Sequence, residues 1–211
     1  MQAPYRRALT IVAALMLSAC SKPRSASDPA LPPPSPGSAP AVVTGRVPVI
    51  TSGTPAVVIL EPRDTGQVPA PSNTPVMDQV ARSFIPPILF VRTGHAAEFR
   101  NSDDELHNIN VKDGVTHQQA FNVAVPTGGQ YLYTFKGTGV YDVSCDIHAG
   151  MSAQIVATST PYATVADPEG RFTFPDVVRG TYVLTVYAGI QTIERTIEVA
   201  GPRTEVDARE Q

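Results

Sequence analysis

Four residues with metal-binding side chains lie in two short segments of this 211-residue chain. Cys145, His148 and Met151 fall within seven consecutive residues, and His107 lies well upstream of them. A thiolate, two imidazoles and a thioether form the ligand set of electron-transfer copper centres. One tight loop could deliver three of these ligands while His107 closes the site from a neighbouring strand. The pattern therefore indicates a redox carrier rather than an enzyme with a substrate of its own.

The chain after residue 41 has to supply those strands. Short β-rich runs recur there, turn signals such as Thr93-Gly94 separate them, and no run has a sustained helical period. Strands at this spacing predict an all-β protein made of sandwiches. A short helix near residues 78–83 is the one exception that this pattern allows. The predicted strands are 56–60, 88–91, 97–99, 108–111, 131–135, 140–143, 171–174, 181–187 and 192–199.

The approach to the candidate loop is expected to be a hairpin. Residues 131–135 and 140–143 are separated by Gly137-Thr-Gly139, which has the composition of a turn. Such a hairpin would lead straight into Cys145, so that the ligand loop hangs from the end of a strand. A loop held in this way suits electron transfer, because its ligands move little between oxidation states.

The N-terminus predicts export. Arg6 and Arg7 precede an apolar run over residues 8–17, which is shorter than the roughly 20 residues of a membrane span but suits a signal peptide. The run ends in Leu17-Ser18-Ala19-Cys20, which resembles the lipobox of bacterial lipoproteins. An ordinary secretory signal with a chance cysteine is the alternative.

The lipobox resemblance implies a lipid-anchored protein. Residues 1–19 would be the signal peptide, and Cys20 would carry the lipid. Residues 20–41 are rich in proline, serine and alanine, which predicts an extended tether. The expected location is the periplasm, anchored to a bacterial membrane, with the outer membrane slightly favoured by Ser21 after the cysteine.

Cysteine count and charge narrow the function further. The chain has two cysteines, so lipidation of Cys20 leaves Cys145 alone in an oxidising compartment. A lone cysteine there indicates a special role such as metal ligation, with a buried free thiol as the simpler alternative. The net charge is −3 and there is no basic run, so nucleic-acid binding has no support.

Residues 75–157 resemble the cupredoxin (type 1 blue copper) family, most closely its plastocyanin and amicyanin branch. The two-residue gap between His148 and Met151 is similar to the short amicyanin loop. The matching segments are Val91-Arg-Thr-Gly94, Glu98-Phe-Arg-Asn-Ser-Asp103, Leu106-His-Asn108, Gly139-Val-Tyr-Asp-Val-Ser-Cys145 and Cys145-x-x-His148-x-x-Met151.

The resemblance implies a Greek-key sandwich that holds one type 1 copper ion cycling between Cu(I) and Cu(II). His107, Cys145 and His148 would be the trigonal ligands and Met151 the axial ligand. Asn108 would tie the two ligand loops together by hydrogen bonds. The alternatives are a cupredoxin fold that has lost or changed its metal, and zinc, for which a methionine is a poor ligand.

Other polar residues of this region have simpler interpretations. His95 follows a turn glycine and His117 lies in a polar stretch, so both are expected at the surface and not at the metal. Four acidic residues fall in the two loops that should meet at the copper end, and they could steer a basic partner such as a cytochrome c. A solvated loop is the alternative. These residues are Asp103, Asp104, Glu105 and Asp146.

A second module follows. Residues 159–200 resemble the transthyretin-like carboxypeptidase regulatory domain, through Gly170-Arg-Phe172 and Gly180-Thr-Tyr182. This segment is short for a sandwich of its own, and residues 42–62 resemble the opening strands of that family. We therefore expect 42–62 and 159–200 to form one sandwich with the copper domain inserted, followed by a polar tail, 201–211. The alternative is a serial order in which 42–62 adds strands to the cupredoxin.

The combination resembles exported plastocyanin-like proteins that are often associated with methylamine utilisation. The predicted function is a periplasmic, lipid-anchored blue copper protein that carries single electrons and is not an enzyme. Its partner would be a redox protein, either a cytochrome c or a periplasmic dehydrogenase, and it would contact the membrane through its lipid. The alternatives are a copper-binding or copper-delivery protein and a metal-free interaction scaffold of the same fold.

Overall fold

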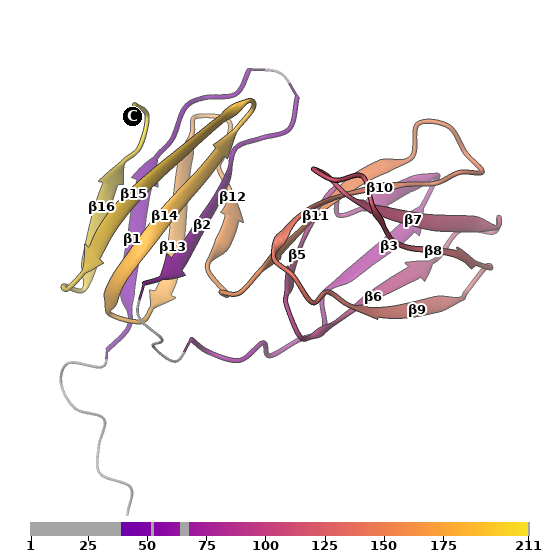
Figure 1. The fold of residues 1–211 in the computed structure, drawn as a ribbon, viewed down its shortest axis with the longest axis horizontal. Helices are drawn as coiled ribbons and strands as arrows, with labels where there is room; N and C mark the ends of the chain where they lie inside the picture. The colour runs from indigo at the N-terminus through magenta and orange to yellow at the C-terminus, as the bar shows by residue number, and fades with distance from the viewer. Residues whose placement is uncertain (1–38, 52, 64–67, 211) are drawn as a thin grey trace, which may run out of the picture. The chain divides into compact units, whose positions relative to one another are not determined.

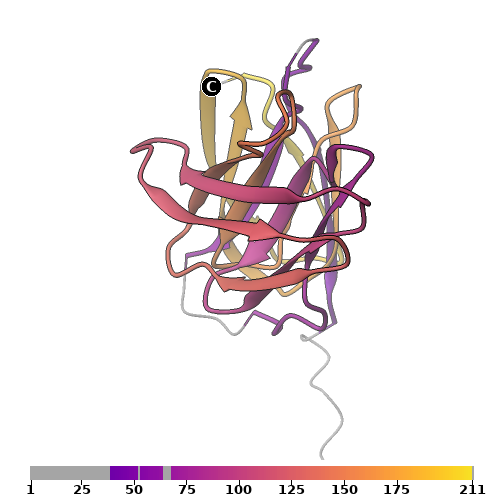
Figure 2. The ribbon, with the colours of Figure 1, turned by 90° about the vertical axis from the view of Figure 1, so that its right-hand side faces the viewer.

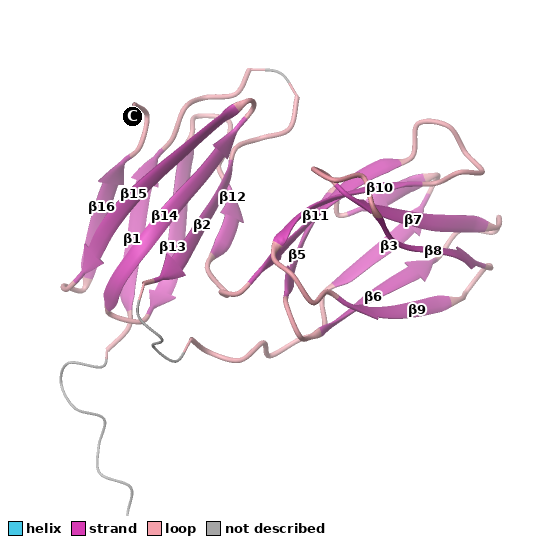
Figure 3. Ribbon diagram, viewed as in Figure 1, coloured by secondary structure: helices cyan, strands magenta, loops and turns pink. Residues whose placement is uncertain are grey.

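The computed structural model describes residues 39–51, 53–63 and 68–210. All regular structure in this part of the chain is β-strand (Figure 3). Across these residues, no helix is long and apolar enough to cross a membrane. The predicted signal peptide, Cys20 and nearly all of the predicted tether lie outside the described residues.

The strands form two sandwiches, each with its own core (Figures 1 and 2). The first sandwich packs the sheet β5-β11-β10-β7-β8 against the sheet β4-β3-β6-β9. The second packs β13-β1-β16 against β12-β2-β14-β15. The strands are β1 (Ala41–Arg46), β2 (Val57–Pro62), β3 (Val76–Val80), β4 (Ser83–Ile85), β5 (Ile88–Arg92), β6 (Ala96–Asn101), β7 (His107–Asp113), β8 (Gln119–Val125), β9 (Gln130–Thr134), β10 (Gly139–Ser144), β11 (Ser152–Thr158), β12 (Ala163–Val165), β13 (Arg171–Val177), β14 (Gly180–Ala188), β15 (Gln191–Val199) and β16 (Arg203–Asp207).

The second sandwich is built from both ends of the described chain. Strand β1 pairs antiparallel with β13, and β2 pairs antiparallel with β12 and β14. The strands of the first sandwich, β3 to β11, lie between β2 and β12 in the sequence. The predicted fold class, all-β with one sandwich inserted into another, is confirmed, and the serial alternative is wrong.

The predicted hairpin before the ligand loop is wrong. Strand β9 pairs with β6, whereas β10 pairs with β7 and β11 in the other sheet. The chain therefore crosses from one sheet to the other between Thr134 and Gly139. Phe135 marks the crossing, because its side chain is buried in the core between the sheets. Alternation predicts which side of a strand is buried but not which strand is its neighbour.

The short helix that the sequence allows near residues 78–83 does not form, because these residues belong to the β3–β4 hairpin. Ala81 and Arg82 form its turn, with φ angles of 50° and 54°. Two-residue hairpin turns of the type I′ class need positive φ at both positions. Residues with a side chain adopt this conformation at a cost of about 1–2 kcal/mol each, so an interaction outside the hairpin has to stabilise the turn.

The C-terminal segment is not a polar tail. Residues 203–207 form β16, which pairs in parallel with β1 at the edge of the sheet. Exposure alternates along the strand, and only Val206 packs against the core. An edge strand with one apolar side chain has the composition of a tail, so its sequence does not reveal the pairing.

We expect Gly45→Ala to destabilise the second sandwich by about 1–3 kcal/mol, the usual effect of overpacking. A Cβ atom at Gly45, in the central strand β1, would lie 2.3 Å from the carbonyl oxygen of Val206 and 2.6 Å from the Phe172 ring. Urea unfolding followed by circular dichroism measures the change. Gly137→Ala is the control, because its nearest atom, the Tyr141 hydroxyl, is 4.0 Å away. Equal stability of the two variants would contradict this packing.

The turn that joins β7 to β8 should make the stability of the fold depend on pH in the acid range. The carboxylate of Asp113 accepts hydrogen bonds from the backbone N–H groups of Thr116 and Val115 and from the Thr116 hydroxyl. These bonds, with the Thr116 N–H first, hold the pKa of Asp113 below its usual value. Because the folded pKa is the lower one, the stabilisation is complete above about pH 4 and is lost as the pH falls through the folded pKa.

Asp113→Asn should therefore lose less stability than the wild type between pH 6 and pH 3. Urea unfolding of the metal-free protein at several pH values measures this slope. Parallel slopes would mean that the Asp113 carboxylate is not the group that senses acid.

Candidate metal centre

Two neighbouring strands bring the candidate ligands together. His107 is the first residue of β7, and Cys145 follows directly after the end of β10. Strands β7 and β10 pair antiparallel, with Ser144 opposite Asn110. The start of β7 therefore lies beside the end of β10, although His107 and Cys145 are 38 residues apart in the sequence.

Three ligand atoms form a small triangle. The Nδ1 atoms of His107 and His148 are 2.9 Å apart, and each is 3.9 Å from Sγ of Cys145. A point in the plane of these atoms can lie about 2.0 Å from both nitrogens and about 2.2 Å from the sulfur, close to usual metal–ligand bonds of about 2.0–2.1 and 2.3 Å. The triangle therefore fits one metal ion without any movement of its ligand atoms.

Met151 closes the loop. Its carbonyl oxygen accepts a hydrogen bond of 3.2 Å from the Cys145 N–H, and its own N–H donates to the carbonyl of His148 at 3.5 Å. The side chain of Met151 is buried in the same core cluster as Cys145. The loop is thus folded back on itself, and all four predicted ligands converge at one end of the first sandwich.

A network of amides fixes the ligand loop to the strands. Asn108 accepts a hydrogen bond from the Asp146 N–H at 2.6 Å and donates to the Asp146 carboxylate at 2.8 Å. It therefore ties the two ligand segments together, the role that the family resemblance implies. Asn110 and Asn122 donate to the same carboxylate at 2.9 and 2.8 Å. The bonds from Asn110, Asn122 and Asn108 hold the pKa of Asp146 below its usual value.

The roles of Asn110 and Asn122 were not predicted from the sequence. Asn110 is two residues after Asn108 on β7, and Asn122 is opposite Asn110 on β8. Three asparagines on one face of two paired strands could have indicated this network. Recognising them requires the register between β7 and β8, which the sequence alone does not provide. Asp146, considered above as a steering charge, is a structural part of the ligand loop.

Each imidazole also meets a carboxylate. Oδ2 of Asp103 is 2.8 Å from Nε2 of His107, and Oε2 of Glu105 is 3.0 Å from Nε2 of His148. The backbone N–H of Arg82, more than the His107 ring, holds the pKa of Asp103 below its usual value. The sequence predicts Asp103 and Glu105 only as possible charges at the rim of the site. Their spacing, with Asp103, Glu105 and His107 at every second residue, was the one sign that they share a side with this ring.

The acidic residues and the remaining histidines differ in their distance from the ligands. Of the four acidic residues, Asp103, Glu105 and Asp146 make hydrogen bonds around the ligands, and Asp104 is exposed. These bonds leave the carboxylates charged, so the steering of a basic partner stays a prediction. His95 and His117 are exposed, and neither belongs to the cluster of potential metal ligands found in the described residues.

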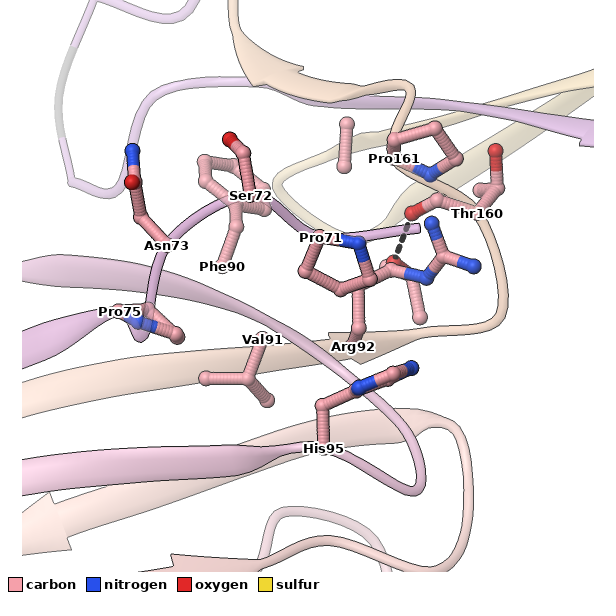
Figure 4. A pocket seen from close by; sticks show the side chains of 12 residues that line it. Pro71, Ser72, Asn73, Pro75, Phe90, Val91, Arg92, His95, Thr160 and Pro161 are labelled. Atoms are coloured by element: carbon pink, nitrogen blue, oxygen red, sulfur yellow. Dashed lines mark hydrogen bonds between the residues drawn. The ribbon is translucent and has the colours of Figure 1, made fainter. Parts of the chain in front are cut away.

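A pocket of about 270 Å³ is separate from the ligand cluster. Figure 4 shows Phe90, Arg92, His95, Thr160 and Pro161 around it. None of the four predicted metal ligands lines this pocket. It therefore has no part in holding the metal.

Comparison with known families agrees with the geometry. Residues 74–158 match the family model of copper binding proteins, plastocyanin/azurin family. This part of the chain is a cupredoxin-like sandwich. The ligands His107, Cys145, His148 and Met151 have the arrangement of a type 1 copper site, and copper is the cofactor that they fit.

A second family model, polysaccharide lyase family 4, domain II, matches residues 137–206. This match overlaps the first one in β10 and β11, which the structure pairs within the cupredoxin-like sandwich. Its remainder covers β12 to β15 and most of β16 in the second sandwich. The match supports a fibronectin-like β domain there. The resemblance to a carboxypeptidase regulatory domain stays a prediction.

Several solved structures are similar to parts of the chain. Amicyanin from Paracoccus versutus is 18% identical over 47% of this chain and 97% of its own, with a TM-score of 0.37. A purple cupredoxin from Nitrosopumilus maritimus is 22% identical over 39% and 98%, with a TM-score of 0.35. A copper-containing nitrite reductase from Thermus scotoductus SA-01 is 25% identical over 46% and 25%, with a TM-score of 0.38. A comparison with curated proteins found no match.

Proposed function

We propose that this protein is a periplasmic, lipid-anchored carrier of single electrons and not an enzyme. The observation that supports this most is the preformed triangle of two imidazole nitrogens and one cysteine sulfur, closed by a buried methionine. Copper bound there supplies one-electron chemistry through its two oxidation states. A site already occupied by four protein ligands leaves no open position for a substrate, unlike a catalytic metal site.

Rigidity of the ligands favours fast electron exchange. His107 lies at the start of a paired strand and is fully buried. Cys145 and Met151 are joined by a backbone hydrogen bond, and Asn108 holds the next residue of the loop. Because these contacts do not involve the metal, they keep the ligand atoms in place whichever oxidation state is present.

The electron would leave through His148. Its side chain is 20% exposed, whereas His107 is buried. Leu106 and Ile147 precede the two histidines in the sequence and are about half exposed, at 51% and 49%. Exposed large apolar side chains favour contact with a partner protein. We propose that a redox protein, a cytochrome c or a periplasmic dehydrogenase, docks over these residues.

Copper delivery is the second candidate function, since the same ligands could release their metal. A carrier of copper ions needs ligands that exchange readily, and these four converge on one point within a sandwich core. The buried positions of His107, Cys145 and Met151 therefore favour a resident metal.

The deciding experiment loads the full chain with Cu(II) and follows visible absorption and EPR. A carrier gives an intense thiolate-to-copper band with a narrow hyperfine splitting, loses the band with ascorbate and regains it with an oxidant. After a second reduction with ascorbate, the Cu(I) form passes one electron to an oxidised cytochrome c and keeps its copper in the presence of a Cu(I) chelator. Copper that leaves for the chelator as soon as it is reduced would favour delivery and contradict the proposal.

The membrane anchor has its own test. Cys20→Ser should move the protein from the detergent-rich phase to the aqueous phase in Triton X-114 partitioning of bacterial membranes, because one lipid-bearing residue is lost. The copper spectrum should not change. A variant that partitions like the wild type would contradict lipid anchoring while leaving the electron-carrier proposal intact.

A further inference from the structure

Both candidate imidazole ligands have a carboxylate on the side away from the metal. Asp103 contacts Nε2 of His107, and Glu105 contacts Nε2 of His148. We propose that Asp103 and Glu105 are positioning residues that lower the Cu(II)/Cu(I) reduction potential of the site, Asp103 more than Glu105. This inference rests on the proposed electron-carrier function and deepens it.

The hydrogen bonds select the ring tautomer. A carboxylate accepts a hydrogen bond, so the geometry points to Nε2 as the protonated nitrogen of each neutral ring, which leaves the lone pair on Nδ1. In both rings it is Nδ1 that points to Sγ of Cys145, at 3.9 Å. The carboxylates therefore hold both rings in the form and the orientation that a metal needs.

The same bonds change the electron density of the ligands. A hydrogen bond from an imidazole N–H to an anion makes the ring a stronger donor to the metal. Stronger donors stabilise the doubly charged Cu(II) more than Cu(I), because the interaction grows with the charge on the ion. The expected consequence is a lower potential than the same ligands would give without carboxylates.

One turn holds both carboxylates. The backbone N–H groups of Ala81 and Arg82 donate to the two oxygens of Asp103, at 2.5 and 2.9 Å. The guanidinium of Arg82 bonds both oxygens of Glu105, at 2.5 to 3.2 Å. These bonds stabilise the left-handed turn between β3 and β4 and fix the carboxylates opposite the rings.

The two carboxylates should not act equally. The side chain of Asp103 is 13% exposed and faces a fully buried ring. The side chain of Glu105 is 41% exposed, and Arg82 neutralises much of its charge. Since a charge acts more strongly in a poorly solvated environment, Asp103 should account for most of the shift in potential.

The test compares Asp103→Asn, Glu105→Gln and the control Asp104→Asn in the full chain. Each variant loses one negative charge, and the exposed Asp104 lies between the other two in the sequence. Redox titration of the copper band measures the potential, and metal competition measures affinity for Cu(II) and Cu(I) separately. ¹⁵N NMR of the metal-free protein reports the tautomer of each ring without any copper.

We expect Asp103→Asn to weaken Cu(II) binding relative to Cu(I) by about tenfold or more, which raises the potential by about 59 mV or more. Glu105→Gln should raise it less, and Asp104→Asn least. In the wild type, NMR should show protonated Nε2 and unprotonated Nδ1 in His107 and His148.

Three results would overturn the inference. Equal losses of Cu(II) and Cu(I) affinity in Asp103→Asn would mean that the residue only supports the fold, and equal shifts in all three variants would mean that net charge alone acts. A wild-type protein with Nδ1 protonated in either ring would remove the tautomer argument. If Asp103→Asn does not fold, the comparison of Glu105→Gln with Asp104→Asn tests the inference. Glu105→Gln should fold, because the turn N–H groups of Ala81 and Arg82 donate to Asp103 and not to Glu105. The NMR measurement uses the metal-free protein, so its result holds even if the protein does not transfer electrons. The two proposals can therefore fail separately.

Discussion

Cys145→Ser abolishes the intense thiolate-to-copper absorption, and this is the largest expected effect of any single substitution. The band arises from charge transfer between a thiolate sulfur and Cu(II). Sγ of Cys145 lies 3.9 Å from the Nδ1 atoms of both His107 and His148, so it is the thiol placed to supply this band. A serine hydroxyl is a hard, protonated group and a poor substitute for a thiolate. Cu(II) affinity should fall by more than the roughly 10–100-fold that follows loss of a residue behind a ligand.

Cys20, the other cysteine of the chain, provides the matched control. Cys20→Ser makes the same residue exchange outside the predicted metal ligands, and its copper-loaded visible and EPR spectra should match those of the wild type. Isothermal titration with Cu(II) gives the affinities. A Cys145→Ser variant that keeps the band would mean that the copper binds elsewhere, and the assignment of the site would be wrong.

Asn108→Ala has the second largest expected effect, because it breaks the connection between the two ligand segments. Asn108 is buried, and it accepts a hydrogen bond from the Asp146 N–H. Its amide N–H group donates to the Asp146 carboxylate and to the amide oxygen of Asn122. An alanine leaves a loop N–H without its partner. Loss of partners for buried polar groups costs about 1–3 kcal/mol, and we expect the metal-free protein to lose that much stability in urea unfolding.

The metal should respond more strongly than the fold. Since Asn108 holds the residue after Cys145, its loss should widen the hyperfine splitting and reduce Cu(II) affinity by about 10–100-fold. Asn122→Ala is the control, because Asn122 also donates to the Asp146 carboxylate, while among the described residues no side-chain hydrogen bond joins it to the loop backbone. If both variants weaken copper binding equally, the carboxylate bonds and not the Asn108–Asp146 backbone bond hold the loop.

The metal ligands were predictable because ligand chemistry is a property of residue types. Cys145, His148 and Met151 are close in the sequence, so a single loop has to present them together. Short β-rich runs, several of them alternating, predicted nine of the sixteen described strands, since alternation follows from the geometry of one strand alone. These features need no knowledge of what lies across the sheet.

The pairing of strands was only partly predictable. Residues 42–62 were expected beside 159–200, and the structure pairs them. The hairpin of 131–135 with 140–143 was expected from the same kind of evidence and does not exist. A turn-like sequence permits a hairpin, but the chain instead crosses to the second sheet, where it buries Phe135 in the core.

By itself, the sequence determined that a thiolate, two imidazoles and a thioether are available, and that strands surround them. Only the tertiary structure decided what stands behind the ligands: Asp103 at His107, Glu105 at His148, and Asn108 at the ligand loop. The physical reason is distance along the chain. A hydrogen bond between residues 38 apart, such as that from the Asp146 N–H to Asn108, exists only once the register of β7 and β10 is set.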